Sequence, residues 1–313
     1  EDGTIVCDFA SFDADVEFAL DELHYNAFFL GPMFGGGTGA GFEKHRQWAG
    51  LEPLSNDFNR YFPEYMRQVG AHLREKGWLD NAYLYLWDEP EPDYFDKVVQ
   101  LHELALKGDP GLKIWLTTSP AHQVFWGTVK AWSVPFSRPN FDEQTVEQRR
   151  AAGEEIWVYN IPTSLEQPAQ TIRLWFWQAA LHDAVGAQLW SVTFYREIDP
   201  WEDITPKPYP VGRTPGRFYV YTAGEAVMLY PNPGLKQEPP VPGPPLSCLR
   251  LRVLQKGIDD FGYCAILRDL LEKKARAEGA ENPHAAAQAR IAEITGQLVL
   301  DIGRWNLDTN QMQ

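Results

Sequence analysis

The sequence has few of the side chains from which metal centres are built. Its three cysteines, Cys7, Cys248 and Cys264, are far apart, and no CxxC pair or Cys/His cluster is present. The seven histidines are scattered, and none belongs to an HExxH pattern. A structural zinc site needs ligands at short, regular spacings, so we predict a protein without a metal or other cofactor. Cys264 falls on the face of an expected helix and is predicted to be a core residue.

A surplus of basic residues is also missing. The chain has 28 Lys and Arg against 43 Asp and Glu, which gives a net charge of −15. This charge argues against nucleic acid and against anionic membrane surfaces as partners. No apolar run reaches the roughly 18 residues that a membrane span needs. The chain starts at Glu1 rather than Met, so we expect a processed, trimmed or partial chain, and a secreted, periplasmic or cytoplasmic location is compatible with it.

Nucleotide-binding motifs are absent as well. Residues 35–41 read GGGTGAG, but this tract has neither the GxxxxGK(S/T) spacing of a P-loop nor a GxGxxG that leads into a helix. We interpret it as a flexible loop between a strand and a helix, at the mouth of a site.

Aromatic residues, in contrast, are abundant. They make up 13% of the 313 residues and include 12 tryptophans. Tryptophan in such quantity serves either a large core or a face on which flat ligands such as sugar rings can stack. The length and the 44% hydrophobic content suffice for one large α/β domain or two small ones.

The most informative stretch is Asn81–Pro92, which reads NAYLYLWDEPEP. Its apolar first half has the length and composition of a buried parallel strand, and it ends in two adjacent carboxylates, Asp88 and Glu89. Acids at the carboxyl end of such a strand lie where α/β folds place their chemistry. Strict alternation would send the two side chains to opposite faces, so both reach one cleft only if the chain leaves the sheet there, and Pro90 favours that exit. In isolation, the sequence Asp88-Glu89-Pro90 could be a capping Asp and a solvated Glu in a loop. Because it follows a strand and lies next to Trp87, we interpret it as part of an active site.

Strand-like and helix-like segments alternate along the chain, which predicts βα units and a parallel sheet. Seven strand candidates are one short of a closed eight-stranded barrel, and a doubly wound sheet is also compatible with them. Aromatic and polar residues at three strand ends favour a (β/α)8 TIM-type barrel, because a barrel brings many strand ends to one mouth. The strand candidates are Thr4–Asp8, Asn26–Phe34, Ala82–Trp87, Lys113–Ser119, Val129–Phe136, Glu155–Ile161 and Gly186–Tyr195, and helices are expected from Asp13 and over Pro63–Lys76, Phe95–Lys107, Glu143–Ala152 and Pro168–Asp183.

The alternation stops in the last third of the chain. Many prolines keep residues 197–247 irregular, although the aromatic residues Trp201, Tyr219, Tyr221 and Tyr230 predict partial order. A long amphipathic helix over 247–274 follows, and an Ala-rich helix lies within 282–305. We predict a catalytic barrel over residues 1–278, including a Pro-rich insertion at 197–247, and a C-terminal helical tail over 279–313.

Five segments occur in an order that matches a known family. They are YLYLWDEP (Tyr83–Pro90), EIWVYN (Glu155–Asn160), GAQLW (Gly186–Trp190), DPW (Asp199–Trp201) and the helix SCLRLRVLQKGIDDFGY (Ser247–Tyr263). Over residues 80–270 the chain resembles the catalytic barrel of glycoside hydrolase family 123 and its relatives of the domain-of-unknown-function 4091 type. The resemblance implies a (β/α)8 barrel, usually behind an N-terminal β-sandwich. Because no sandwich precedes Thr4, we expect a barrel that is incomplete at its N-terminus.

The resemblance also implies an activity, the exo-hydrolysis of β-linked N-acetylgalactosamine from a glycan. In that family the sugar's own 2-acetamido oxygen attacks the anomeric carbon. Asp88 and Glu89 match the family's catalytic pair, with Asp88 orienting the acetamide and Glu89 protonating the leaving oxygen. The expected substrate-binding residues are Trp87, Trp157, Tyr159, Asn160, Trp190 and Tyr195, although core packing explains each tryptophan equally well.

Two other functions stay open at the level of sequence. A conventional retaining glycosidase would use Glu89 as the acid and Glu197 as the nucleophile. A non-catalytic relative would bind a glycan through the same aromatic residues. We favour a loop-capping role for Glu197 and Asp199 over catalysis, and the intact Asp88–Glu89 pair favours the acetamido-sugar hydrolase.

Overall fold

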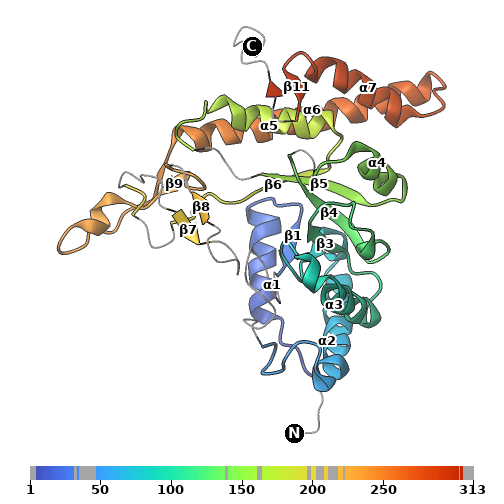
Figure 1. The fold of residues 1–313 in the computed structure, drawn as a ribbon, viewed down its shortest axis with the longest axis vertical. Helices are drawn as coiled ribbons and strands as arrows, with labels where there is room; N and C mark the ends of the chain where they lie inside the picture. Colours follow the sequence, from blue (N-terminus) through green and yellow to red (C-terminus); the bar gives the residue numbers. More distant parts are fainter. Residues whose placement is uncertain are drawn as a thin grey trace. The chain divides into compact units, whose positions relative to one another are not determined.

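The computed structural model describes most of the chain (Figure 1). The described residues are 5–31, 34, 47–137, 140–160, 164–195, 199–201, 208–210, 218–220, 223–302 and 304–305. The glycine tract at 35–41 and Glu197 lie outside them, so the interpretations of both stay predictions.

The main sheet has six strands, and their order follows the sequence from β1 to β6. Every pair whose register is described is parallel. A doubly wound sheet would reverse its order at a switch point, whereas a consecutive order is the one a (β/α) barrel has. Among the described residues the sheet stops at six strands, so the closed eight-stranded barrel stays a prediction. The strands are β1 (Phe28–Leu30), β2 (Ala82–Leu84), β3 (Ile114–Thr117), β4 (Val129–Pro135), β5 (Glu155–Asn160) and β6 (Gly186–Leu189).

The first predicted strand is wrong, because residues 5–8 belong to no strand. A side chain of helix α2 (Asn56–Glu75) binds their backbone instead. The Gln68 amide nitrogen donates to the Ile5 carbonyl at 2.9 Å, and the Gln68 amide oxygen accepts from the Cys7 N–H at 3.3 Å. One glutamine therefore satisfies backbone groups that a neighbouring strand would otherwise bind.

Helix α2 begins at Asn56, earlier than predicted. The Ser55 hydroxyl caps it by accepting from the Phe58 N–H at 3.3 Å. Pro63 therefore lies inside the helix and not in its first turn, where it removes one helical hydrogen bond. The buried face that carries Phe58 and Phe62 outweighs this loss. The other helical segments of this part are α1 (Ala10–Glu17), continued by the π-helix η1 (Phe18–Glu22), α3 (Phe95–Gly108), α4 (Glu143–Ala151), and the 3-10 turns η3 (Leu79–Asn81), η4 (Pro92–Tyr94) and η5 (Gln123–Phe125).

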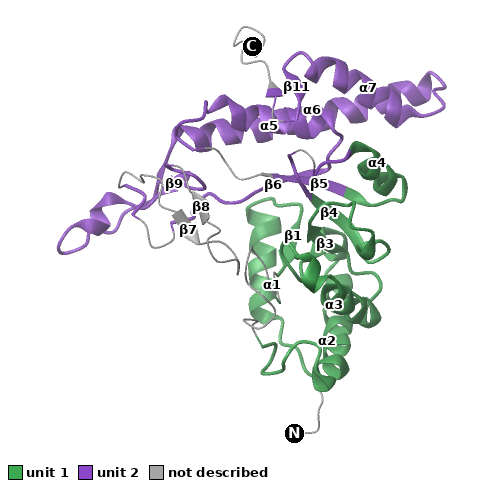
Figure 2. Cartoon of the chain, viewed as in Figure 1, with its two compact units in different colours: residues 1–133, 143–155, 211–215 green, residues 134–142, 156–210, 216–313 purple. Residues whose placement is uncertain are grey.

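The chain divides into two compact units, which Figure 2 shows in two colours. The first comprises residues 1–133, 143–155 and 211–215, and the second comprises residues 134–142, 156–210 and 216–313. The first unit holds β1 to β3 with α1 to α4, and the boundary falls within β4 and at the start of β5.

In the second unit, three helices form a layer of their own: α5 (Gln170–Leu181), α6 (Leu249–Ala277) and α7 (Pro283–Thr295). One core cluster joins Ala180, Cys264 and Ile291 from the three helices, so Cys264 is a core residue as predicted. A second cluster joins α5 to residues beyond α7, where β11 (Val299–Asp301) pairs with β12 (Arg304–Trp305). The predicted domain boundary at residue 278 stays a prediction.

Several segments of the Pro-rich insertion form regular structure. Its short strands pair antiparallel, β7 (Pro208–Pro210) with β8 (Phe218–Val220) and β9 (Leu229–Tyr230) with β10 (Leu246–Ser247), and the 3-10 turn η6 (Pro233–Lys236) lies between the latter two. The Trp201 indole N–H donates to the Pro231 carbonyl at 3.0 Å, and its ring lies 4.9 Å from that of Tyr230. These contacts agree with the order predicted for Trp201 and Tyr230.

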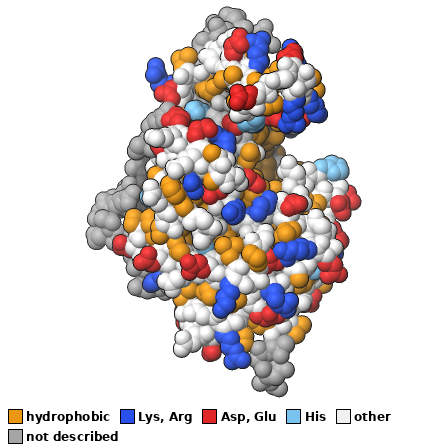
Figure 3. Space-filling model, turned by 90° about the vertical axis from the view of Figure 1, so that its right-hand side faces the viewer, with side chains coloured by type: hydrophobic (Ala, Val, Ile, Leu, Met, Phe, Trp, Pro, Cys, Tyr) orange, Lys and Arg blue, Asp and Glu red, His pale blue; other side chains and the backbone are white. Residues whose placement is uncertain are grey.

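The surface carries both signs of charge. Figure 3 shows acidic and basic side chains mixed over the face in view. Within the part of the chain that the structure describes, no helix is both long and apolar enough to cross a membrane.

Candidate active site

Asp88 lies just beyond the carboxyl end of β2, where two hydroxyl groups bind one of its carboxylate oxygens. The Thr117 hydroxyl, from the end of β3, donates to Asp88 Oδ1 at 2.7 Å. The Tyr85 hydroxyl donates to the same oxygen. The two hydroxyl oxygens lie 3.2 Å apart, so they form a compact pair of donors against one carboxylate oxygen.

The alternation of side chains along the strands explains this meeting. Phe29, Tyr85 and Trp115 come from β1, the segment after β2, and β3, and their rings contact one another on one face of the sheet. The Trp115 ring centroid is 4.6 Å from that of Phe29 and 4.7 Å from that of Tyr85. Thr117 follows Trp115 by two residues and therefore shares its face. The aromatic layer thus fixes the Tyr85 ring, which holds its hydroxyl against Asp88.

Burial and the Asp88 carboxylate both raise the pKa of the Tyr85 hydroxyl far above its usual range. Tyr85 is 7% exposed, so the phenolate form would be poorly solvated there. The hydroxyl therefore keeps its proton and stays a hydrogen-bond donor to Asp88 at any pH at which the protein works.

Glu89 follows Asp88 in an unusual backbone conformation, with a φ of +44°. A non-glycine residue adopts this left-handed region only where its surroundings stabilise it. The Glu89 N–H donates to the Thr117 hydroxyl oxygen at 2.8 Å, and the buried Pro90 follows. The side chains of Asp88 and Glu89 are both half-buried. The strand β2 itself ends at Leu84, earlier than the predicted Trp87, and the left-handed backbone of Glu89 then breaks the extended conformation, in agreement with the exit from strand geometry that the sequence predicted for these two residues.

Trp87 is buried, with only 2% of its surface exposed. Its ring stacks on that of Tyr94 at 5.7 Å between centroids. Of the two roles that the sequence left open for Trp87, this packing favours the core, and its role as a sugar platform stays a prediction.

Trp157 and Tyr159 lie on β5, in the second unit, and share one side of the strand. Both are half-buried, whereas Ile156 and Val158 on the other side are buried. Trp157 is paired with Gly186 of β6, and a Cβ at position 186 would overlap the indole ring. A glycine is needed there because the Trp157 ring lies across the neighbouring strand.

Three other residues of the second unit were predicted to bind the substrate: Asn160, Trp190 and Tyr195. Asn160 is the last residue of β5 and is paired with Leu189, but its side chain lies outside the described part. Trp190 is half-buried, and its ring lies 4.3 Å from that of Phe194. The Tyr195 hydroxyl donates to the Leu229 carbonyl at 2.6 Å, which ties the end of this segment to β9.

Asp199 has a structural role in the insertion. It forms an ion pair with Lys236, and its Oδ1 accepts from the Trp201 N–H at 2.9 Å. The Lys236 ammonium is the main cause that lowers the pKa of the Asp199 carboxyl. These contacts suit the loop-capping role that the sequence favoured over catalysis.

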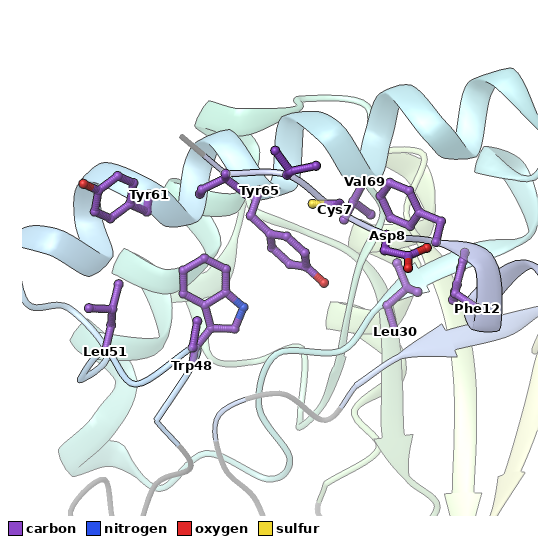
Figure 4. A pocket seen from close by; sticks show the side chains of 13 residues that line it. Cys7, Asp8, Phe12, Leu30, Trp48, Leu51, Tyr61, Tyr65 and Val69 are labelled. Atoms are coloured by element: carbon purple, nitrogen blue, oxygen red, sulfur yellow. The ribbon is translucent and has the colours of Figure 1, made fainter. Parts of the chain in front are cut away.

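A cavity of about 740 Å³ lies elsewhere in the first unit. In Figure 4 the rings of Trp48 and Tyr65 point into it, with Asp8 and Phe12 towards one end. Leu30 of β1 lines this cavity, whereas its neighbour Phe29 contacts Tyr85 on the opposite face of the sheet. Asp88 and Glu89 are not among the lining residues, so the sheet separates this cavity from the carboxylate pair.

Sequence reasoning missed Tyr85 and Thr117 as parts of the site. Thr117 carried a usable signal, because it is a polar residue at the carboxyl end of the strand next to β2. Tyr85 carried none, since an aromatic residue within a strand is most simply a core residue. Among the described residues, no three His, Cys, Asp or Glu side chains gather as metal ligands.

Residues 1–267 match the family model of the glycoside hydrolase 123 catalytic domain. No curated protein sequence matches the chain. Among solved structures, the chain resembles a family 123 glycoside hydrolase from Clostridium perfringens, studied for glycolipid glycan hydrolysis, with a TM-score of 0.50 and 19% identity. The match covers 77% of this chain and 39% of that one, so the chain spans less than half of that enzyme's length, and the likeness concerns the fold.

Proposed function

Because the chain belongs to the glycoside hydrolase 123 family of catalytic domains, we propose that it removes a terminal β-linked N-acetylhexosamine, with N-acetylgalactosamine as the sugar. The proposed mechanism is substrate-assisted and retains the anomeric configuration. The observation that carries the proposal is the carboxylate pair at the end of β2, with Asp88 held by two hydroxyl donors and Glu89 beside it.

Asp88 is the proposed partner of the substrate's acetamide group. Its Oδ1 accepts from Tyr85 and Thr117, which fixes the carboxylate plane while Oδ2 can accept from the acetamide N–H. The orientation brings the acetamide oxygen towards the anomeric carbon, and the negative charge stabilises the positively charged oxazolinium that forms. A carboxylate that is already held in place loses little orientational freedom when the substrate binds.

Glu89 is the proposed general acid. Its task is to protonate the glycosidic oxygen as that bond breaks, and then to take a proton from the water that opens the oxazoline. The acetamide does the work of a second protein carboxylate as nucleophile, so the usual distance rule for two catalytic carboxylates does not apply. The left-handed backbone of Glu89 sends its side chain in a direction that regular strand alternation would not.

The sugar-binding residues are proposed from their positions at strand ends. They are Trp157, Tyr159, Asn160, Trp190 and Tyr195, with Trp87 as a further candidate. The half-buried state of Trp157, Tyr159 and Trp190 supports a role in ligand binding, because such side chains keep some surface that a ligand can cover. Tyr195 is the weakest of the set, since its hydroxyl already donates to the Leu229 carbonyl.

A panel of three nitrophenyl glycosides tests the proposal. We expect turnover of the β-N-acetylgalactosaminide, less of the β-N-acetylglucosaminide and almost none of the β-galactoside, which lacks the acetamide nucleophile. A thiazoline analogue of the oxazoline should inhibit strongly, because it resembles the species that the site stabilises. Equal turnover of the β-galactoside would favour a conventional retaining glycosidase. Glycan binding without any turnover would favour a non-catalytic protein.

A further inference from the structure

A single hydroxyl group, that of Thr117, joins the two proposed catalytic residues. Its oxygen accepts from the Glu89 N–H at 2.8 Å, and its proton is donated to Asp88 Oδ1 at 2.7 Å. The count of protons is consistent, because Tyr85 and Thr117 each have one hydroxyl proton and both are directed at Asp88. The lone pairs of the Thr117 oxygen remain to accept from the Glu89 backbone.

The position of this hydroxyl is fixed by the sheet. Thr117 is the last residue of β3, is paired with Ser133 of β4, and is 2% exposed. The next residue continues the attachment, because the Thr118 N–H donates to the Ser133 carbonyl at 3.1 Å. Thr117 is also β-branched, and such side chains have few χ1 rotamers. The oxygen is therefore a fixed point to which the segment after β2 attaches.

The Glu89 backbone depends on this fixed point. Its φ of +44° costs conformational energy for a residue with a Cβ, and the hydrogen bond to Thr117 is formed in that conformation. Without the hydroxyl, the N–H of the half-buried Glu89 would need another acceptor, and the backbone dihedral angles would change to reach one. Such a change of the backbone would point the Glu89 side chain in a different direction.

We propose that Thr117 is a positioning residue that sets the placement of the acid Glu89 and of the carboxylate of Asp88 relative to each other. The proposal rests on the proposed function for the roles of the two carboxylates. It distinguishes Thr117, whose hydroxyl contacts both residues, from Tyr85, whose hydroxyl donates to Asp88 and lies 3.2 Å from that of Thr117. Loss of the Thr117 hydroxyl disturbs both the proton transfer by Glu89 and the orientation of the acetamide by Asp88. Loss of the Tyr85 hydroxyl disturbs only the orientation of the acetamide.

Three variants separate these effects. Thr117→Val keeps the shape but removes the hydroxyl, Thr117→Ser keeps the hydroxyl, and Tyr85→Phe removes the other donor to Asp88. Each is assayed on the nitrophenyl β-N-acetylgalactosaminide, whose leaving group departs without a proton, and on the phenyl glycoside, which needs the acid. Circular dichroism and thermal unfolding establish that each variant is folded.

For Thr117→Val we expect kcat on the nitrophenyl substrate to fall by about tenfold or more, with a smaller change in KM, since one hydrogen bond to a charged group is lost. The fall on the phenyl glycoside should be several times larger. Thr117→Ser should stay within about threefold of the wild type on both substrates. Tyr85→Phe should slow both substrates by the same factor. Wild-type kinetics for Thr117→Val, or equal losses on both substrates, would overturn the proposal.

Crystal structures test the positioning role of Thr117 independently of the proposed enzymatic activity. If the wild type turns over neither glycoside, the proposed function fails, and crystal structures of the wild type and Thr117→Val then decide the role of Thr117. A change of Glu89 out of the left-handed region, together with a displaced Asp88 carboxylate, supports the positioning role. An unchanged Glu89–Asp88 arrangement contradicts it.

Discussion

At the scale of single residues, the burial of each tryptophan decides what its removal should do. Trp87 is 2% exposed and stacks on Tyr94, while Trp157 is half-buried and lies over Gly186. The two therefore respond to different measurements, stability for Trp87 and substrate affinity for Trp157.

We predict that Trp87→Ala lowers the free energy of unfolding by about 3–5 kcal/mol, because a large buried side chain leaves a cavity. Trp157→Ala should instead weaken binding of an N-acetylgalactosamine analogue by about 1 kcal/mol, roughly fivefold, through loss of ring stacking. Denaturant unfolding and titration calorimetry measure the two effects, with Trp190→Ala as a second test of the stacking role. If Trp157→Ala and Trp190→Ala both fold and keep normal affinity, these residues do not bind the sugar.

Asp88 and Glu89 could be found because they follow an apolar run, and strand ends are where parallel sheets place polar chemistry. The role of Tyr85 could not be found, because ring contacts with Phe29 and Trp115, from neighbouring strands, hold its hydroxyl against Asp88. The positive φ of Glu89 also depends on a contact with Thr117, 28 residues away in the chain, and no local pattern encodes it.

At the scale of elements, one histidine connects the three helices of the second unit. His284, in the first turn of α7, contacts Glu272 of α6 through Nδ1 and Asp183, just after α5, through Nε2, each at 2.7 Å. Arg268 faces Asp183 at 2.9 Å, and Arg276 faces Glu272 at 3.3 Å. Both ring nitrogens can donate only in the protonated imidazolium. The hydrogen bonds to Glu272 and Asp183 accordingly raise the pKa of His284.

This arrangement predicts a pH dependence of stability with a definite sign. The pKa of His284 is higher in the folded protein than in the unfolded chain, so its contribution is fully present below the unfolded value of about 6.5. The contribution is lost as the pH rises through the folded value. Because the His284 side chain is 47% exposed, solvent screening limits the effect to about 0.5–1 kcal/mol.

Denaturant unfolding at pH 6 and pH 9 measures the effect. The wild type should lose stability over this interval relative to His284→Gln, whereas His24→Gln, at an exposed position in the first unit, should behave like the wild type. The same loss in His284→Gln as in the wild type would show that the three-helix contact does not depend on this proton.

The elements themselves could be predicted where hydrophobic period and end signals agreed. The helix over Phe95–Gly108 and the strand over Glu155–Asn160 lie within a residue of their predicted bounds. Two strands are shorter than predicted, Phe28–Leu30 within the predicted Asn26–Phe34 and Gly186–Leu189 within the predicted Gly186–Tyr195. Two further errors arose where a side chain binds the backbone. Gln68 binds the segment that had been predicted as the first strand, and Ser55 starts α2 ahead of Pro63.

At the scale of the whole molecule, the strand order is the strongest structural argument for a barrel. In the part of the chain that the structure describes, the six strands of the main sheet follow one another without reversal. The family match extends over residues 1–267, further towards the N-terminus than the resemblance at 80–270 that the sequence motifs revealed. The first 80 residues carry no such motif, so the sequence placed them in the barrel only through the alternation of strand and helix candidates and not through the resemblance.

We predict that strands running parallel to β1 and β6 at the outer edges of the sheet complete the barrel, which crystallography of the protein can establish. Closure by strands in the same direction would keep all carboxyl ends at the rim where Asp88 and Glu89 lie. An antiparallel strand at either edge, or a strand order that reverses, would contradict the barrel.

The central claim is that Asp88 and Glu89 perform different tasks in one substrate-assisted reaction, and the dependence of rate on the leaving group tests it most directly. The measurement compares kcat of the wild type, Asp88→Asn and Glu89→Gln on nitrophenyl and phenyl β-N-acetylgalactosaminides. Glu89→Gln should retain most activity on the nitrophenyl substrate and lose about 10²-fold or more on the phenyl substrate, which needs the acid. Asp88→Asn should lose about 10²-fold or more on both, because the charge facing the oxazolinium is gone. Equal losses in both variants on both substrates, or a severe loss in Glu197→Gln with a glycosyl group trapped on Glu197, would contradict the account.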